Sequence, residues 1–509
     1  MNRRLFIAAI AVLPLLADTE TYAIAYPHFA DNPFTLGVAS GEPNHNSVVL
    51  WTKLAPRPLD PDGGMPASNV EVTYEIATSD AFTTIIKSGK TQAQRLLGHS
   101  VHVEVDDLHP DSWYWYRFHA GDATSAVGRT RTLPLPSANV NQLRFAFVSC
   151  QHYEAGYFTA YKHLAADDLD LVFHLGDYIY EASGAENKPR KHSNAKLLNV
   201  TDYRIRYNQY RTDPWLQAAH AHCPWFVTWD DHEVENNYAG DIGGLKGSET
   251  VTFLIQRANA YQVYYEMMPL RRSSIPRGPD MQIYRKATYG NLAELLILDT
   301  RQYRSDQPNG DTASPINEAT LAADQTMLGL QQRQWLEAGL VASRGTWNVI
   351  AQQVMMAMVD RSPGPVQNYS MDQWPGYARE RMALARTIEE RKVANTVVLT
   401  GDIHTNWVND LRVDDRKTEL PVVATEFVGT SITSGGDGVD KPKRLDGLLQ
   451  ENPCVRFHNQ QRGYVRCTLT PKTWVADFMV VDQVTRPGGM LSKRAVFVID
   501  AGRPGAHEG

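Results

Sequence analysis

Three side chains with uncommon metal-binding chemistry lie at the ends of two apolar runs. Cys150 follows the first run, in Val-Ser-Cys-Gln-His, while Asp177 and Tyr180 follow the second, in Leu-Gly-Asp-Tyr-Ile-Tyr-Glu. A thiolate, a carboxylate and a phenolate together suit a strongly Lewis-acidic cation such as ferric iron better than a structural zinc. A third apolar run ends in Gly-Asp-Ile-His and supplies Asp402 and His404. The first interpretation is therefore a metal-dependent hydrolase.

The densest acidic cluster follows another apolar run, 225–229. Asp230 and Asp231 are adjacent, His232 comes next, and Asn237 follows shortly after. Two neighbouring carboxylates buried without partners would cost several kcal/mol, and a divalent cation would remove that cost. Oxygen ligands of this kind suit calcium or magnesium. His232 is placed to protonate a leaving oxygen or to bind a phosphate oxygen. The alternative is a solvated, negatively charged loop.

Each of these motifs also has a simpler interpretation when taken alone. An isolated Cys150 is more often a small buried hydrophobe than a ligand. Asp177 could begin a turn that two packed tyrosines follow. Asp402 and His404 fall on one side of an extended backbone, so both can face one metal cluster, but such triplets are common by chance. Four strand-end clusters in one chain are much less common by chance.

Composition sets the outer limits. The chain has 509 residues, which suggests two or three domains, and 43% apolar residues, enough for a large core. Its 57 acidic and 50 basic residues give a formal charge of −7, so no global electrostatic case exists for nucleic acid or an anionic membrane as a partner. Four cysteines in so long a chain do not form a disulfide scaffold.

The first residues predict an export signal. Arg3 and Arg4 precede Leu-Phe-Ile and an apolar run over 8–17 that is short for a bilayer span. Paired arginines fit the twin-arginine signal, with a general secretory signal as the alternative. We expect the signal peptide to lie within residues 1–25, with cleavage after Ala17 or Ala25. Twin-arginine export carries folded proteins, so the expected partner is that machinery, the mature protein has no transmembrane segment, and its location is periplasmic or extracellular.

Residues 33–134 predict a β-sandwich. Short alternating or apolar runs are separated by turn residues, as in 47–52, 70–76 and 99–105. The stretch 108–116 resembles the fibronectin type III pattern, in which a Leu-x-Pro turn leads into a tyrosine-rich strand. We interpret this part as an accessory domain, with carbohydrate or wall binding as the alternative.

Residues 140–500 predict an α/β layered domain behind a proline-containing linker at 133–139. Strand-like runs alternate with helix-like stretches, and most of the strands end directly before a polar cluster. That order places the site at the carboxyl edges of the strands. A β-rich section over 422–499 is expected to complete the same sheets. The expected strands are 143–148, 169–175, 225–229, 295–298, 347–350 and 396–400, and the expected helices are 156–166, 202–210, 252–267, 331–342 and 377–390.

In combination these motifs resemble the alkaline phosphatase D family over nearly the whole chain. The motifs are Ser149-Cys150, Gly-Asp-Tyr-Ile-Tyr-Glu at 176–181, Trp-Asp-Asp-His-Glu at 229–233, Asn236-Asn237, Leu-Asp-Thr-Arg at 298–301, Leu328-Gly329 with Gln332 and Trp335-Leu336, Gly-Asp-Ile-His at 401–404, Glu-Phe-Val at 426–428 and Ser-Ile-Thr-Ser at 431–434. The resemblance implies an immunoglobulin-like domain and then a calcineurin-like metallophosphoesterase domain, a four-layer α/β/β/α sandwich. The family hydrolyses phosphomonoesters and phosphodiesters, and some relatives are described as phospholipase D enzymes.

The resemblance also implies a role for each site residue. Ferric iron (Fe3+) would be held by Cys150, Asp177, Tyr180 and His404, with Asp177 bridging to a second ion. Calcium (Ca2+) would be held by Asp402, Asn237 and at least one of Asp230 and Asp231. Arg257 resembles a family arginine near the substrate phosphate, with a helix-surface salt bridge as the alternative. The Ser-Cys-Gln and Asp-Asp-His-Glu motifs depart from the wider metallophosphoesterase pattern, and both departures are shared with alkaline phosphatase D.

The expected mechanism is attack on phosphorus by a metal-activated oxygen nucleophile, with clustered cations neutralising the phosphate oxygens. The expected substrate is a small-molecule or lipid phosphoester. A phospholipase D or nucleotide phosphodiesterase with the same metals is the first alternative, and a non-catalytic wall- or glycan-binding protein the second. Cys454 and Cys467 either pair outside the cytoplasm or remain free thiols.

Overall fold

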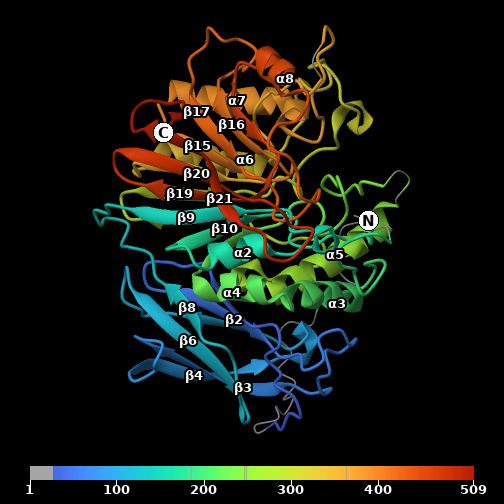
Figure 1. Cartoon of the computed structure of the whole chain (residues 1–509), viewed down its shortest axis with the longest axis vertical. Helices are drawn as coiled ribbons and strands as arrows, with labels where there is room; N and C mark the ends of the chain where they lie inside the picture. The colour runs from blue at the N-terminus through green and yellow to red at the C-terminus, as the bar shows by residue number, and fades with distance from the viewer. Residues whose placement is uncertain (1–26, 185, 246, 248, 363) are drawn as a thin grey trace.

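The computed structural model describes residues 27–184, 186–245, 247, 249–362 and 364–509 of the chain. The signal-peptide prediction for residues 1–25 lies outside these residues. No helix in the described part combines the length and the apolar character needed to cross a membrane. The strands form three sheets, which Figure 1 shows stacked with helices between and outside them.

The largest sheet carries the first set of predicted site motifs. Its three central strands, β9, β10 and β11, run parallel, and β19 pairs antiparallel with β9 on the other side. The β-rich C-terminal section therefore does extend this sheet, as expected. In spatial order the ten strands are β22 (His507–Glu508), β21 (Leu491–Asp500), β20 (Thr473–Val481), β19 (Arg462–Leu469), β9 (Leu143–Val148), β10 (Leu171–Leu175), β11 (Trp225–Thr228), β1 (Val38–Gly41), β2 (Val48–Lys53) and β5 (Ser100–Val105).

A seven-stranded sheet carries the remaining motifs. Strands β13, β14, β15 and β17 are parallel, while β12, β16 and β18 pair antiparallel at its two sides. In spatial order the strands are β12 (Arg285–Tyr289), β13 (Ala293–Ile297), β14 (Trp347–Ala351), β15 (Thr396–Thr400), β17 (Ala424–Val428), β16 (Asn406–Leu411) and β18 (Val455–Asn459).

The two large sheets pack face to face, and helices cover their outer faces. Phe147 and Phe173 of the first sheet share a buried cluster with Phe427 of the second. Val148 belongs to the cluster on the opposite face, where it packs with the helices, so both faces of β9 are buried and the strand is largely apolar. The covering helices are α2 (Thr159–Leu164), α3 (Val200–Arg211), α4 (Pro214–His222) and α5 (Thr250–Met267) on the first sheet, and α6 (Gly329–Ala342), α7 (Ala378–Glu390) and α8 (Leu445–Glu451) on the second.

The predicted strands and helices of this region are confirmed, with shifts at their ends. The helix expected over 202–210 is α3, which starts earlier because Asn199 and Asp202 form a capping box. Helix α4 was not predicted, although its start signal is present: Asp213 caps the first turn and Pro214 occupies the first helical position. Only Thr212 and Asp213 separate α3 from α4, so the connection is too short to stand out as a loop.

The N-terminal strands form a sandwich that shares a sheet with the rest of the molecule. A five-stranded sheet packs against β1, β2 and β5 through a separate buried cluster that includes Leu50, Val72 and Tyr116. Strand β1 in turn pairs in parallel with β11, at Gly41 and Trp225. The five strands are β4 (Ile85–Ala93), β3 (Val70–Ala77), β6 (Trp113–Ala120), β7 (Ala123–Thr124) and β8 (Gly128–Arg131).

All four cysteines are free and buried. Cys454 packs in the cluster between the second sheet and its helices. Cys467 packs between the two large sheets. Of the two alternatives for this pair, free thiols are confirmed and the disulfide is wrong, because the two residues are buried in different layers.

Gly41 is the contact point of the sandwich with the sheet of the site. A Cβ atom at this position would lie 2.6 Å from the Pro269 carbonyl oxygen and 2.8 Å from that of Trp225. We expect Gly41→Ala to lower the free energy of unfolding by about 1–3 kcal/mol, the usual range for overpacking. Urea denaturation measures this free energy of unfolding. Ser40→Ala, which adds no atom to the same strand, should change it by less than about 1 kcal/mol; equal losses in the two variants would contradict the clash.

Candidate metal centre

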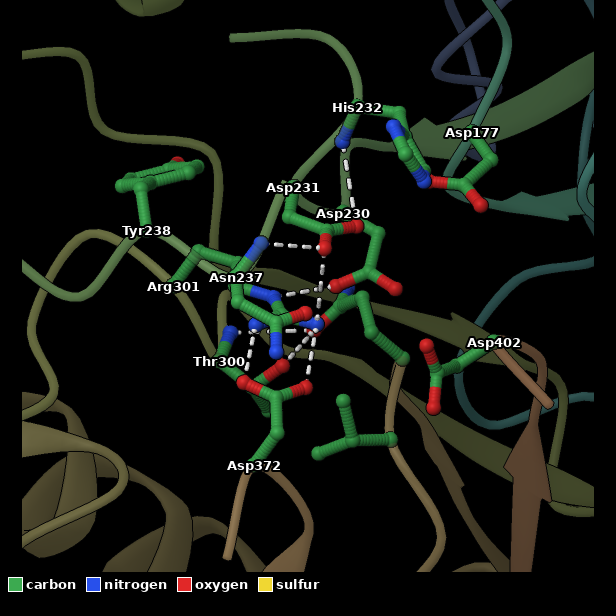
Figure 2. Close-up of polar contacts among 12 residues, drawn as sticks. Asp177, Asp230, Asp231, His232, Asn237, Tyr238, Thr300, Arg301, Asp372 and Asp402 are labelled. Carbon is green, nitrogen blue, oxygen red and sulfur yellow. Dashed lines mark hydrogen bonds and ion pairs between the residues drawn. The ribbon is translucent and has the colours of Figure 1, made fainter. Parts of the chain in front are cut away.

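The predicted site residues lie at the carboxyl ends of strands from both large sheets. Cys150 and Asp177 follow β9 and β10, which are parallel neighbours. Asp230 follows β11, and Asp402 follows β15 of the second sheet. Figure 2 shows the carboxylates of Asp177, Asp230 and Asp402 directed toward one region. Cys150, Asp177 and Asp230 are buried, and Asp402 is partly buried.

The backbone at these strand ends is held in an uncommon conformation. A positive φ is unusual for a residue with a Cβ atom, and such residues concentrate at functional sites. Asn, Asp and His adopt it most readily, and Cys does not share that tendency. The residues concerned are Cys150 (φ 57°), Asp177 (56°), Asn237 (56°), Asp402 (65°) and His404 (59°).

The four residues expected to hold iron lie together. Single ligand atoms of Cys150, Asp177 and His404 all lie within 4.8 Å of one another. The Tyr180 hydroxyl donates to Asp177 Oδ2 at 2.8 Å and lies 3.2 Å from His404 Nε2. Thiol, carboxyl, phenol and imidazole therefore face a common point.

Two further side chains hold this group in place. Ser434 Oγ lies 2.6 Å from the Tyr180 hydroxyl and 2.8 Å from the Cys150 carbonyl oxygen. The Arg462 guanidinium donates to the His404 carbonyl oxygen and, at 2.8 Å, to Ser431 Oγ. The loop after β17 and the start of β19 thus brace the ligands that come from β9, β10 and β15.

A second group shares Asp177 with the first. Ligand atoms of Asp177, Asp231 and His232 also lie within 4.8 Å of one another. Asp231 is fixed by two backbone N–H groups, from His232 at 3.0 Å and from Asn237 at 2.7 Å. Asp177 is therefore the carboxylate common to both groups.

Arg301 lies beneath the acidic residues and is fully buried. Its Nε donates to Asp230 Oδ1 at 2.5 Å, and Nη1 and Nη2 donate to the two Asp372 oxygens at 2.6 and 2.9 Å. The second Asp230 oxygen, Oδ2, is buried without a partner among the described residues. Burial lowers the pKa of Arg301, but Asp230, Asp231 and Asp372 outweigh it, so the guanidinium stays charged.

Glu233 ties the two strand-end turns together. Its carboxylate accepts backbone N–H groups from Asp177 at 3.1 Å, Tyr178 at 2.5 Å and Asp230 at 2.9 Å. The residue is 1% exposed. Because these N–H groups are buried beyond the ends of the strands, a side-chain acceptor has to satisfy them.

The electrostatics of this region fit bound cations. Asp177 Oδ1 and Asp230 Oδ2 are both buried without hydrogen-bond partners in the described part of the chain. Burial raises the pKa of each of these carboxyls well above the usual range, although His232 opposes it at Asp177 and Arg301 at Asp230. Burial and Asp372 raise the pKa of Asp402 to about 6. Divalent or trivalent cations would offset this concentration of buried negative charge.

Asp402 and Asn237 complete the oxygen-rich part of the site. Gln373 donates to Asp402 Oδ2 at 3.0 Å. Asn237 donates through Nδ2 to Asp311 Oδ2 at 2.5 Å, which leaves its side-chain carbonyl oxygen as the group available to a cation. The two residues offer oxygen ligands only, as calcium prefers.

His232 is placed for proton transfer. Its Nδ1 lies 2.7 Å from Glu181 Oε2, and its ring packs on Tyr180 with centroids 4.2 Å apart. Burial lowers the pKa of His232, but Asp177, Asp231 and Glu181 outweigh it and raise the pKa well above its usual value. A protonated imidazole can both neutralise a phosphate oxygen and deliver a proton.

Arg257 contacts the loop that follows Asn237. Its guanidinium donates to the Gly240 carbonyl oxygen, and the residue is 1% exposed. Nη2 also pairs with Asp241 at 3.1 Å and lies 3.7 Å from Asp280. These contacts anchor the loop that carries Asn237, and the phosphate-binding role of Arg257 stays a prediction.

Sequence reasoning missed several residues that build the site. Arg301 and Ser434 lie in family motifs but had no assigned role. Asp372, Gln373 and Arg462 had no signal, because each lies outside the strand-end positions on which the prediction depended. The ligand candidates that these residues support were all predicted. Arg301 and Asp372 support Asp230, Gln373 contacts Asp402, and Arg462 contacts His404.

Comparison with known proteins agrees with this arrangement. Residues 145–478 match the PhoD-like phosphatase family, and residues 21–134 match the PhoD-like phosphatase N-terminal domain. Alkaline phosphatase D of Bacillus subtilis (strain 168) is 52% identical over 486 residues, which are 94% of this chain and 83% of that protein. Purple acid phosphatase 23 of Arabidopsis thaliana is 31% identical over 151 residues, 27% of this chain and 31% of that one. A solved structure of PhoD superimposes with a TM-score of 0.93 at 51% identity, covering 95% of this chain and 93% of that one.

The position of Asp177 and Asp230 depends on Glu233. Glu233→Gln puts an amide N–H against the backbone N–H donors, so we expect a loss of about 1–3 kcal/mol in the free energy of unfolding. The hydrolytic kcat/KM toward a phosphomonoester should fall at least about tenfold, because misplacing catalytic groups raises the barrier. Denaturation and steady-state assays measure both.

Glu235→Gln is the matched control for this change. Glu235 lies two residues further on, is also buried, and accepts the Leu245 N–H at 2.9 Å. Its replacement should leave kcat/KM within about twofold. A Glu233 variant that behaves like the Glu235 variant would exclude Glu233 as the residue that positions the strand ends.

Proposed function

The chain belongs to the PhoD-like phosphatase family, and we propose that this phosphoric ester hydrolase is exported and releases phosphate from phosphomonoesters, with phosphodiesters as a second substrate class. The observation that carries the proposal is the convergence of Cys150, Asp177 and His404, with Asp177 also shared by Asp231 and His232. The resemblance to alkaline phosphatase D of Bacillus subtilis supports the same substrate class.

The donor set supports two kinds of cation. Ferric iron would be held by Cys150, Asp177, Tyr180 and His404, because thiolate and phenolate stabilise a strongly Lewis-acidic ion. Calcium would be held by oxygen ligands, from Asp402, Asn237 and at least one of Asp231 and Asp230, whose Oδ2 has no partner among the described residues. When bound, the cations supply Lewis acidity toward the phosphoryl oxygens and activate an oxygen nucleophile.

The protein's own residues supply the rest of the chemistry. Glu181 accepts the Nδ1 proton of His232, which fixes the ring and leaves Nε2 as the nitrogen that can protonate the leaving alcohol. The Arg301 guanidinium beneath the acids limits the repulsion that a phosphate anion meets on entering this acidic site. Arg257 has a structural role, because it anchors the loop before α5 that carries Asn237.

The proposed location follows from the sequence. Arg3-Arg4 and the apolar run after them predict twin-arginine export to the periplasm or the medium, with residues 1–25 removed. Export after folding suits a site whose iron ligands come from strands far apart in the chain. We further propose 33–134 as the sandwich domain and 140–500 as the catalytic domain.

Removal of the thiol tests the iron assignment and the activity together. We expect Cys150→Ala to lose bound iron, any visible colour of the holoenzyme, and at least about a hundredfold in kcat/KM for 4-nitrophenyl phosphate, because the ion supplies several kcal/mol of transition-state stabilisation. Cys223→Ala removes another buried thiol, which packs among the helices, and should keep iron and activity.

Iron content by plasma mass spectrometry and circular dichroism separate loss of metal from loss of fold. Full activity in a folded Cys150→Ala protein would exclude the thiolate as a ligand. Phosphatidylcholine, offered to the wild type beside the monoester, tests the substrate class. Release of choline at a comparable kcat/KM would favour a phospholipase D over the phosphatase proposed.

The role of His232 is tested by varying the leaving group. We expect His232→Asn to lower kcat/KM for an alkyl phosphate about 10²- to 10⁴-fold, the range for loss of a general acid. For 4-nitrophenyl phosphate, whose leaving group needs little protonation, the loss should be much smaller. Equal losses for the two substrates would instead indicate that His232 binds a cation or the phosphate, a role that its position beside Asp177 and Asp231 also permits.

A further inference from the structure

A cavity of about 460 Å³ lies between the N-terminal sandwich and helices α3 and α5, away from the metal centre. One wall is the loop over 61–67 together with the turn that ends in Gly98 and His99. The opposite wall includes Arg204, Asn208 and Gln262. Small-molecule sites often lie at such boundaries between structural units.

Lys53, the last residue of β2, lines this cavity and has almost no partner. The residue is 2% exposed, and its ammonium group donates to the Met267 thioether, at 3.5 Å. A thioether is a weak acceptor, whereas an ammonium group carries three donors. Among the residues that the structure describes, no carboxylate forms an ion pair with Lys53.

The nearest acid is already committed elsewhere. Glu266 accepts from Arg204 at 2.6 and 2.7 Å and from Gln262 at 3.0 Å. Burial lowers the pKa of Lys53 to about 8, and Glu266 offsets only part of that effect. Near neutral pH the amine is still mainly charged, so the wall of the cavity holds a buried cation that forms no ion pair with any residue the structure describes. Such a charge costs several kcal/mol unless an anion compensates it.

The rim of the cavity carries a second cation and an acid. Asn208 belongs to the wall, where its Nδ2 donates to the Pro58 carbonyl oxygen at 2.8 Å. Arg95 lies at the exposed rim. Asp62, also exposed, is an acid on that rim. The lining therefore complements a small anion, with Lys53 as the buried cation of the wall.

We propose that this cavity is a second ligand site, which binds a small oxyanion through Lys53. A tetrahedral oxyanion and a small carboxylate both have this chemistry. The bound anion supplies the counter-charge for Lys53 and links the sandwich to α3 and α5. The site is independent of the metals and of phosphoester hydrolysis.

Equilibrium dialysis of the full-length, metal-loaded protein counts the bound anions. Radiolabelled sulfate serves as the tetrahedral probe and radiolabelled malonate as the carboxylate probe, each up to about 10 mM. Wild type should bind one more anion per chain than Lys53→Met, or bind it at least about tenfold more tightly, the worth of a hydrogen bond to a charged group. The probe that shows this difference identifies the source of the oxyanion.

Two further variants complete the test. Lys472→Met, which removes an exposed lysine between β19 and β20, should bind as wild type does. Asn208→Asp places a carboxylate in the cavity and should weaken the same anion about as much as Lys53→Met does, which keeps the test decisive if Lys53→Met does not fold. Anions bound at the metals contribute equally in all four proteins, so they do not affect the differences in the number of bound anions. Equal numbers and affinities in all four, with both probes, would overturn the proposal.

Discussion

The burial of several carboxylates at one sheet edge is the constraint on which the rest of the structure depends. Asp177, Asp230 and Asp402 come from three strands in two sheets, and each is removed from water at a point where other carboxylates repel it. Arg301 offsets part of this charge through Asp230 and Asp372. It leaves one oxygen of Asp177 and one of Asp230 without a partner among the described residues. The fold therefore concentrates negative charge where cations can bind, and offsets only part of it with its own side chains.

The same constraint explains the backbone of the site. A strand that simply continued would direct alternate side chains to opposite faces, and the carboxylates could not meet. A residue with positive φ follows each of three strands and turns the chain sharply, at Cys150, Asp177 and Asp402. The N–H groups at these strand ends need acceptors outside the ladder, and Glu233 accepts three of them. The buried carboxylate of Glu233 thus fixes the turns that place the other carboxylates. It acts as a positioning residue, and the other carboxylates are the candidate ligands.

Sequence reasoning found the candidate ligands because strand-end acids, thiols and imidazoles are chemically distinctive and parallel strands end at one edge. It could place Asp177 near Cys150 without a structure, since both follow strands of the same kind, and β9 and β10 are indeed neighbours. It could not place Asp372, because its position depends on how a loop from a distant segment folds back over the edge. Nor could it show that β1 pairs with β11 at Gly41, since the periodicity of a strand predicts its faces and leaves its partner open. Arg257 was placed by resemblance alone, and in the fold its guanidinium donates to the Gly240 carbonyl oxygen.

The shared sheet gives the N-terminal sandwich a part in the site that its sequence did not predict. His102 Nε2 lies 2.9 Å from the carbonyl oxygens of Tyr265 and Met268, and Trp51 Nε1 donates to that of Glu266 at 2.8 Å, so β5 and β2 together cap the C-terminal end of α5. Carbonyls in the last turn have no partner within the helix and need an external donor. Earlier in α5, Arg257 anchors the loop that carries Asn237. The sandwich therefore fixes the helix, and the helix fixes one side of the metal centre. On this account the accessory domain contributes rigidity to a site to which it supplies no ligand.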